Sequence, residues 1–118
     1  MLQIKLSHGY TLCVADDNLA LMTPYVLLEQ EAWFEDEVNI LPELAPPGSV
    51  LVDIGANHGI YTLALAQRAA LCGGRVIAFE PNPGLHPGLE ASLAANQLAH
   101  LVKLRHEGLS REPGQAQF

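Results

Sequence analysis

The 118-residue sequence predicts an α/β protein in which a parallel sheet is flanked by helices and preceded by a β-hairpin and short helices. Three observations lead to this fold class. The apolar run Val50–Ile54 is followed by the glycine-containing segment Gly55–Gly59 and then by a long apolar segment. A second apolar run, Arg75–Phe79, comes next, and the acid Glu80 stands directly after it. Strands that alternate with helices in this way form parallel sheets with right-handed crossovers.

Residues 1–48 are predicted to form a hairpin and short helices beside the sheet. Two runs of alternating apolar and polar residues, Gln3–Leu6 and Tyr10–Val14, flank a turn at Gly9, which is typical of a β-hairpin. Thr23 followed by Pro24 has the form of a helix start, with a capping hydroxyl and then proline at the first helical position. We therefore expect a short helix over residues 25–31.

A second helix is expected to begin at the acidic segment Glu35–Glu37, since negative charge favours the positive end of the helix dipole. Trp33 and Phe34 precede it, and core packing is their commoner role. The sequence Pro46-Pro47-Gly48 ends the helix. Its predicted apolar face consists of Val38, Ile40, Leu41 and Leu44.

Within residues 49–118, the continuous apolar run Val50–Ile54 predicts a strand covered on both faces. A helix over Ile60–Leu71 is expected to stop at Gly73 and Gly74. A proline deep inside a helix would break it, so Pro87 is placed near the start of the next helix. The apolar stripe of that helix consists of Leu85, Leu89 and Leu93.

The last elements are a helix end at Asn96, predicted as a left-handed cap, and a third strand over Leu101–Arg105. The segment Gly108–Phe118 is predicted to be a loop, with a further strand over Ala116–Phe118 as an alternative. The expected order across the sheet is third, second, first. The strand Val50–Ile54 then has a free edge, which invites pairing with another chain.

Composition excludes several function classes. The formal net charge is −7, and the six basic residues are scattered, which disfavours nucleic acid or an anionic membrane as the main partner. No apolar stretch approaches the ~20 residues that a membrane span needs. The first residues do not have the pattern of a signal peptide. Cys13 and Cys72 have no metal or redox spacing, so we expect reduced thiols in a cytoplasmic protein, and a disulfide between them is the less favoured alternative.

The segment after the first parallel strand carries the pattern of a nucleotide site. Gly55 and Gly59 permit a tight turn, and the following helix start presents unpaired N–H groups. Glu80 stands 25 positions after Gly55, close to where an acid holds a ribose diol in such folds. Asp53 could orient the loop amides or meet a positive ligand group. Each also has a simpler interpretation: the glycines as a turn, Glu80 as a solvated acid and Asp53 as a helix cap.

The loop sequence narrows the choice of cofactor. A dinucleotide fingerprint has a second glycine that admits the pyrophosphate, and Asn57 stands in that position here. A side chain there obstructs a pyrophosphate but suits a smaller ligand that needs polar contacts. The sequence therefore disfavours NAD and FAD and, with them, a nucleotide-dependent oxidoreductase.

The segment Val52–Tyr61, which reads VDIGANHGIY, together with Phe79–Pro83, FEPNP, resembles the FkbM-type family of S-adenosylmethionine-dependent methyltransferases. The segments Leu21–Glu31 and Trp33–Glu37 are similar to what precedes the domain in some members, and Gly108–Ser110 is similar to the segment after the third strand. The resemblance implies a class I, Rossmann-like methyltransferase domain, with residues 49–118 as its S-adenosylmethionine-binding half.

The resemblance also implies roles for particular residues. Most of the glycine loop, and Asp53 before it, would line the methionine and ribose part of S-adenosylmethionine. Glu80 would hold the ribose hydroxyls, and Asn82 would contact ribose or adenine. Glu107 lies where the loop after the third strand often meets adenine. The full set of implied cofactor-binding residues is Asp53, Gly55, Ala56, Asn57, Gly59, Glu80 and Asn82.

The family's members continue through further strands that carry much of the acceptor site, and these strands are not in this sequence. The implied activity is O-methylation of a sugar or small-metabolite hydroxyl, with small-molecule or glycan acceptors as partners. The alternative is a non-catalytic nucleotide-binding or interaction remnant. Self-association through the free edge of Val50–Ile54 is a further expectation. No catalytic base can be named, and His86, His100 and His106 lack metal-ligand spacing.

Overall fold

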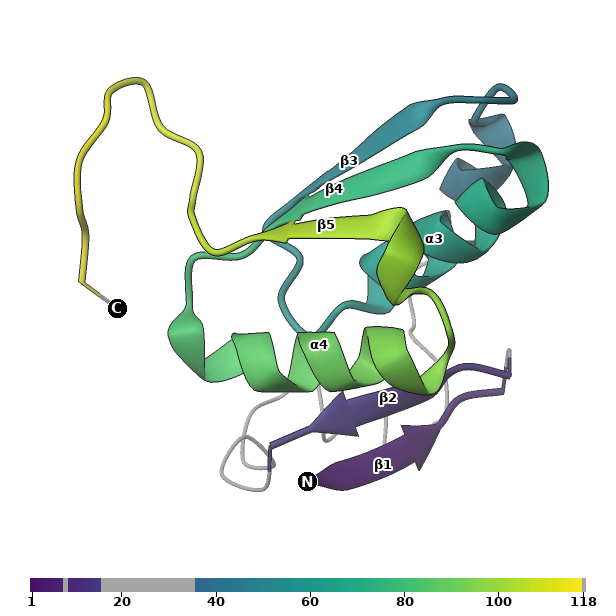
Figure 1. Cartoon of the computed structure of the whole chain (residues 1–118), viewed down its shortest axis with the longest axis horizontal. Coiled ribbons are helices and arrows are strands. Elements are labelled where there is room, and N and C mark those ends of the chain that lie inside the picture. Colours follow the sequence, from purple (N-terminus) through teal and green to yellow (C-terminus); the bar gives the residue numbers. More distant parts are fainter. Residues whose placement is uncertain (8, 16–35, 118) are drawn as a thin grey trace.

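The computed structural model describes residues 1–7, 9–15 and 36–117, and it contains one antiparallel hairpin and one three-stranded parallel sheet (Figure 1). The order of the parallel sheet is β3-β4-β5, as expected. The predicted fold class is confirmed. The helix expected over 25–31, together with Trp33 and Phe34, lies outside the described residues. The strands are β1 Leu2–Lys5, β2 Thr11–Val14, β3 Val50–Ile54, β4 Arg75–Phe79 and β5 Val102–Arg105.

The two long helices lie on the same face of the parallel sheet, and the hairpin packs against α4 on the side away from the sheet (Figure 1). Two successive right-handed crossovers that advance in one direction place both helices on one face. Leu51, Val76 and Ala78 point from the sheet into this layer. The helical elements are α2 Glu37–Ile40, η2 Leu41–Leu44, α3 Ile60–Cys72, η3 Pro83–Leu85, α4 His86–Ala95 and η4 Ala99–Leu101, where η denotes a 3-10 helix.

The other face of the sheet is not covered by any described residue. Val50, Val52 and Ile54 point to this side and are 47%, 51% and 65% exposed. The expectation that β3 is covered on both faces is therefore wrong for the described part of the chain. The strand is a sheet edge, as predicted. Pairing of two chains through that edge stays a prediction.

The apolar face predicted for the second helix is confirmed at Val38 and wrong at the other three residues. Ile40, Leu41 and Leu44 are exposed, whereas Val38 and Pro42 are buried. Pro42 has no N–H to donate, and the α-helix gives way to a 3-10 helix at this point. The buried positions are Val38, Pro42 and Ala45, which are spaced four and three residues apart, so a different face of this segment from the predicted one packs on α3.

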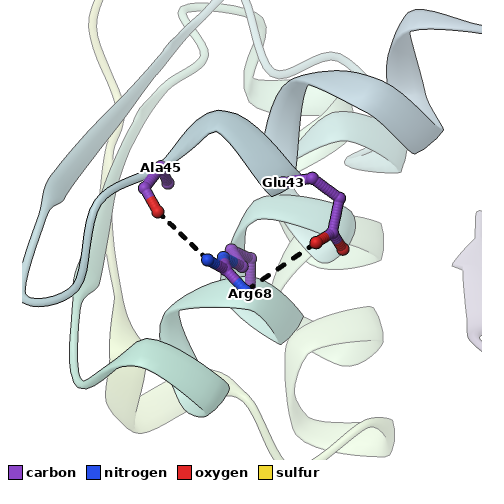
Figure 2. Close-up of polar contacts among 3 residues, drawn as sticks. All are labelled: Glu43, Ala45 and Arg68. Atoms are coloured by element: carbon purple, nitrogen blue, oxygen red, sulfur yellow. Dashed lines mark hydrogen bonds and ion pairs between the residues drawn. The ribbon is translucent and has the colours of Figure 1, made fainter.

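Arg68 of α3 holds η2 in place (Figure 2). Its Nη2 donates a hydrogen bond to the Ala45 carbonyl at 3.2 Å, and its Nη1 lies 3.8 Å from a carboxylate oxygen of Glu43. Beside this contact is a cavity of about 190 Å³ between α2, η2, α3 and the hairpin turn, and Leu71 is part of its wall. The segment of α2 and η2 is thus attached to the sheet layer through α3.

Helix ends follow local rules in most places. Gly73, at φ +72°, ends α3, and its N–H bonds to the Ala69 carbonyl. Pro87 lies in the first turn of α4. All three leucines of the predicted stripe, Leu85, Leu89 and Leu93, are buried. These predictions are confirmed.

Asn96 ends α4 but is not left-handed, because its φ is −98° and the positive φ of +59° belongs to Gln97. The Asn96 side chain instead joins α4 to the hairpin. Its Oδ1 accepts from the Thr11 N–H at 2.9 Å, and its Nδ2 donates to the carbonyls of Thr11 and Ser92. Ser92 adds a second link, since its hydroxyl accepts from the Cys13 N–H at 2.7 Å.

Replacement of Asn96 by alanine is expected to loosen the hairpin from α4. The Thr11 N–H and C=O lose their partners, and each such loss costs about 1–3 kcal/mol when the group stays buried. Urea unfolding should show this as a lower midpoint with an unchanged slope. Asn39→Ala removes the same side chain at an exposed position of α2 and is the matched control. Equal midpoints for the two variants would contradict the link.

The remaining features concern the carboxyl-terminal segment and the thiols. Residues 108–117 form neither helix nor strand, so the alternative strand is absent at Ala116 and Gln117, and Phe118 lies outside the described residues. Cys13 and Cys72 are free thiols.

No helix in the described ranges is both long and apolar enough to cross a membrane. Those ranges also contain no cluster of three metal-ligating side chains.

Candidate functional site

The loop between β3 and α3 is built from residues with left-handed backbone. Gly55, Asn57 and Gly59 have φ values of +79°, +56° and +98°. The N–H groups of Gly55 and Ala56 both donate to the Phe79 carbonyl at 2.9 Å. The loop is therefore fixed to the end of β4, and α3 begins directly beneath it.

Gly59 is required by packing as well as by backbone conformation. A Cβ at this position would lie 2.6 Å from Cδ2 of Leu89, which is buried in α4. This close approach brings the start of α3 against α4. Gly55 differs, because nothing lies within 4 Å of a Cβ built there. The two predicted glycines thus have different roles: Gly59 packs against the protein, whereas the backbone at Gly55 is open to a ligand.

Glu80 connects two loops at the carboxyl ends of β3 and β4. Its side chain is almost fully buried, at 6% exposure for the residue. One carboxylate oxygen accepts from the Asn57 N–H at 2.7 Å, and the other accepts from the Asn82 N–H at 2.9 Å. Charge-assisted bonds of this kind compensate the burial of the carboxylate. The interpretation of Glu80 as a solvated acid is wrong.

The backbone of Glu80 is held equally firmly. Its N–H donates to the Arg105 carbonyl at 3.0 Å, and the His86 Nε2 lies 2.6 Å from its carbonyl oxygen. A carbonyl can only accept, so His86 carries its proton on Nε2 in this contact. His86 also stacks on His106, with ring centroids 3.7 Å apart. The histidine pair therefore supports the position of Glu80 from outside the loop.

Asp53 points under the loop toward α3. Its Oδ2 accepts a hydrogen bond from the Thr62 hydroxyl at 2.6 Å. Burial raises the pKa of Asp53, the Thr62 bond opposes this, and the charge of Glu80 adds to the increase. The residue at the N-cap of α3 is Gly59, and the hydrogen bond that joins Asp53 to α3 goes to the Thr62 side chain rather than to a backbone N–H. Thr62 is fully buried, and the sequence analysis did not single it out.

Asn82 and Glu107 have partners within the protein. The Asn82 Oδ1 accepts from the Gly84 N–H at 3.0 Å and so caps η3. The Glu107 carboxylate forms an ion pair with Arg105. Beside them, a hollow of about 600 Å³ lies between Pro81 and the segment 106–116. This hollow adjoins the loop that carries Glu80.

His58 is the one buried histidine within the loop, at 5% exposure. Burial lowers its pKa below 6.5, and the nearby charge of Glu80 opposes the change. Between the lowered pKa and 6.5, the unfolded chain binds a proton that the folded chain does not. His58 therefore contributes stability above pH 6.5, and this contribution is lost as the pH falls.

Replacement of His58 by glutamine, which does not titrate, is expected to flatten the decrease in stability between about pH 7 and about pH 5. Urea midpoints at several pH values would measure it. His100→Gln removes an exposed histidine and is the control, which should keep the wild-type pH dependence. A pH profile of His58→Gln that runs parallel to that of the wild type would contradict the assignment.

The pKa shift of Asp53 acts on stability in the opposite sense. Its raised pKa gives stability below pH 3.8 that is lost as the pH rises.

The structure brings the predicted residues together at one edge of the sheet. Asn57, Glu80 and Asn82 are linked directly, and Asp53 and Gly55 lie at the end of the adjacent strand. Thr62 and His86 complete the arrangement and were missed. The sequence did offer a signal for Thr62: it places a hydroxyl in the first turn of the predicted helix, nine positions after Asp53, where it could donate a hydrogen bond to that carboxylate. Binding of a cofactor by these residues stays a prediction.

The fold of this chain is similar to part of several solved structures. It is similar to an S-adenosylmethionine-dependent O-methyltransferase from Thermotoga maritima, with a TM-score of 0.57 and 18% identity, over 64% of this chain and 29% of that chain. A putative transferase from Pyrococcus horikoshii matches with a TM-score of 0.64 and 18% identity, over 87% and 35%. YjhP from E. coli matches with a TM-score of 0.53 and 14% identity, over 70% of this chain and 32% of that chain. The chain therefore has part of a methyltransferase-like fold.

In sequence, the chain is 40% identical over 93 residues to the AMB antimetabolite synthetase AmbE of Pseudomonas aeruginosa. The matched region is 78% of this chain but 4% of that protein. The chain likewise spans about a third of the solved structures that it resembles. No protein-family model matches the sequence, so membership of the FkbM-type family stays a prediction.

Proposed function

We propose that this chain is the S-adenosylmethionine-binding part of a methyltransferase. The observation that carries the proposal is the position of Glu80, whose buried carboxylate joins the glycine loop to the loop after the adjacent parallel strand. Nucleotides bind at the carboxyl ends of parallel strands, and an acid at the second strand holds the ribose. The likeness to the Thermotoga O-methyltransferase fold supports the same cofactor.

The residues present fit this cofactor. A carboxylate has about four acceptor sites, and backbone N–H groups use two of those of Glu80, one on each oxygen. Each oxygen therefore keeps a site for one hydroxyl of a ribose diol. The open backbone at Gly55 admits a ligand, and the Asp53 carboxylate offers negative charge near a sulfonium and ammonium. The Asn82 amide group keeps its two donors for ribose or adenine, because its cap uses the oxygen.

S-adenosylmethionine, when bound, supplies an activated methyl group. The chain's own residues would bind and orient it, because transfer of this kind depends mainly on the alignment of the acceptor with the methyl carbon. We propose a hydroxyl of a sugar or small metabolite as the acceptor, in line with the resemblance to FkbM-type enzymes. Nucleic acid is disfavoured by the net charge of −7.

A second candidate is a non-catalytic nucleotide-binding or interaction module with the same fold. The observation that favours it is that both carboxylate oxygens of Glu80 and the Oδ1 of Asn82 already accept hydrogen bonds from backbone N–H groups of the protein. Such a module would bind S-adenosylmethionine or its product without transferring the methyl group. Binding and transfer must therefore be measured separately.

The test is calorimetric titration of the purified chain with S-adenosylmethionine and S-adenosylhomocysteine, with NAD as the control. Saturable binding of the first two alone supports the cofactor assignment. Transfer of a labelled methyl group to hydroxyl compounds then separates the enzyme from the non-catalytic module. A folded chain that binds neither methionine derivative contradicts the proposed function, and binding of NAD alone would favour an oxidoreductase.

A further inference from the structure

Exposed large apolar side chains gather in two places in the described part of the chain. The first group lies on the uncovered face of the sheet and consists of Val50, Val52 and Ile54. The second group lies around α2 and η2 and consists of Ile40, Leu41, Leu44 and Leu71, all between 48% and 74% exposed. Exposed apolar side chains that gather on one part of a surface commonly mark an interaction site.

The sheet group continues into basic charge. The strand register places Val52, Ile77 and Lys103 in one row across the exposed face, and Ile54, Phe79 and Arg105 in the next. Arg75 lies beside Val50 on the same face. Arg75, Lys103 and Arg105 are half of the chain's six basic residues, and of these Arg105 pairs with Glu107, which leaves Arg75 and Lys103 as the main cations offered to a partner. We call this surface, Val50, Val52, Ile54, Arg75, Ile77, Phe79, Lys103 and Arg105, the sheet patch.

A hollow of about 400 Å³ lies at the amino-terminal ends of β4 and β5, with Arg75, Ile77 and Lys103 among its lining residues. It is large enough for side chains of a partner. A hollow lined by both cationic and apolar groups is complementary to a partner surface on which acidic side chains surround apolar ones. The sheet patch therefore fits an amphipathic, acidic helical surface.

The second apolar group has that chemistry. Asp36, Glu37 and Glu43 are exposed around Ile40 of α2 and the leucines of η2, and the Glu43 side chain is 73% exposed. Glu43 pairs with Arg68 at 3.8 Å (Figure 2), so Asp36 and Glu37 are the main acids that this surface offers to a partner. We call this surface, Asp36, Glu37, Ile40, Leu41, Glu43, Leu44 and Leu71, the helix patch. It packs on α3, within the layer that covers the opposite face of the sheet.

We propose that the helix patch of one copy of this chain binds the sheet patch of another. Helices on a sheet face are a stable way to bury it, and here the apolar centres and the flanking charges are both complementary. The two patches differ, so the contact is heterologous and copies add head to tail. Each copy uses both patches, and the assembly grows with concentration.

The pattern of charge argues for this geometry over pairing through strand edges. Lys103 and Arg105 lie on β5, which is one sheet edge, and charged edge strands resist pairing. Pairing of two β3 edges would be isologous and stop at a dimer. The strand β3 reads VLVDI and has no basic residue, so a contact between two β3 edges offers no opposite charges for salt to screen, and the −7 charge of each copy is common to both geometries. Contact between the sheet patch and the helix patch weakens with salt, because opposite charges meet.

The first measurement is sedimentation velocity of the intact chain over a range of concentrations, at about 0.05 M and about 1 M sodium chloride, where the Debye length falls from more than 10 Å to about 3 Å. We expect species larger than a dimer at low salt and at least about tenfold weaker association at high salt. A monomer at all concentrations, or a dimer that strengthens with salt, overturns the proposal.

The second measurement uses one disabled patch at a time. Val52→Asp with Lys103→Glu alters the sheet patch, and Leu41→Lys with Leu44→Lys alters the helix patch. All four residues are exposed, and circular dichroism checks that each variant is folded. Each double variant alone should be monomeric, whereas an equal mixture should form a 1:1 heterodimer and nothing larger.

That mixture is possible only for a heterologous contact, since each variant keeps one intact patch. Leu109→Lys changes an exposed apolar residue outside both patches and should assemble like wild type. A helix-patch variant that still assembles, or a mixture that stays monomeric, overturns the proposal. These readouts do not involve S-adenosylmethionine, so failure here is distinct from failure of the proposed function.

Discussion

Replacement of Glu80 by glutamine is expected to weaken binding of S-adenosylmethionine at least about tenfold and to destabilise the fold. Each buried backbone N–H left without an acceptor costs about 1–3 kcal/mol. Glutamine keeps one acceptor oxygen, but its amide group would face either the Asn57 or the Asn82 N–H, donor against donor. The affinity falls further because one acceptor for the proposed ribose diol is lost.

The Glu80→Gln experiment has to separate a loop effect from a ligand effect. Urea unfolding gives the stability of the variant, and calorimetry under conditions where it remains folded gives its affinity. Glu90→Gln is the matched control: Glu90 lies on α4, its side chain is 60% exposed, and its partner is His106 rather than backbone N–H groups. It should retain both stability and affinity. Unchanged affinity in folded Glu80→Gln would show that Glu80 connects the loops without binding the ribose.

Replacement of Gly59 by alanine is expected to destabilise the protein by about 2–5 kcal/mol, from left-handed strain of about 1–2 kcal/mol and overpacking of about 1–3 kcal/mol. The strain arises because φ is +98°. The overpacking arises because the added Cβ would lie 2.6 Å from Leu89 Cδ2, and Leu89 is 1% exposed. The start of α3 would shift away from α4, and the loop with Asn57 would shift with it.

Two glycine controls separate the causes. Gly9→Ala adds a Cβ at φ +89° with nothing within 4 Å, so its loss of stability measures backbone strain alone. Gly114→Ala has neither a positive φ nor a nearby atom and should be close to neutral. Urea unfolding of the three variants gives the comparison. A loss for Gly59→Ala no larger than that for Gly9→Ala would mean that Leu89 moves aside easily and that α3 and α4 are not held in contact here.

The sequence alone was sufficient wherever one local rule decided the outcome. The strand Arg75–Phe79 was predicted with its observed ends, and Gly73 and Pro87 marked the end of α3 and the start of α4. The buried leucine stripe of α4 followed from its spacing. These are consequences of backbone geometry and of side-chain period, which depend on neighbours in the chain. Asp53 and Glu80 were placed near each other for the same reason, since neighbouring parallel strands have their carboxyl ends on the same side of a sheet.

The tertiary structure decided which partner each polar group has. Sequence spacing placed Glu80 near the glycine loop, but it did not show that two backbone N–H groups occupy its carboxylate. Nor did it indicate that Thr62 binds Asp53 or that Asn96 joins the hairpin to α4. Such contacts join residues on different elements, and their geometry depends on how the elements pack.

Burial was the other property that the sequence left open. Val52 and Leu41 have the apolar character of core residues, yet both are exposed in the described structure. An apolar pattern shows that a face gains free energy when it is covered, because water is released from it. Whether a covering element is present depends on the arrangement of the whole fold. The sequence by itself therefore determined the elements and their order, and only the tertiary structure decided which apolar faces remain open to a partner.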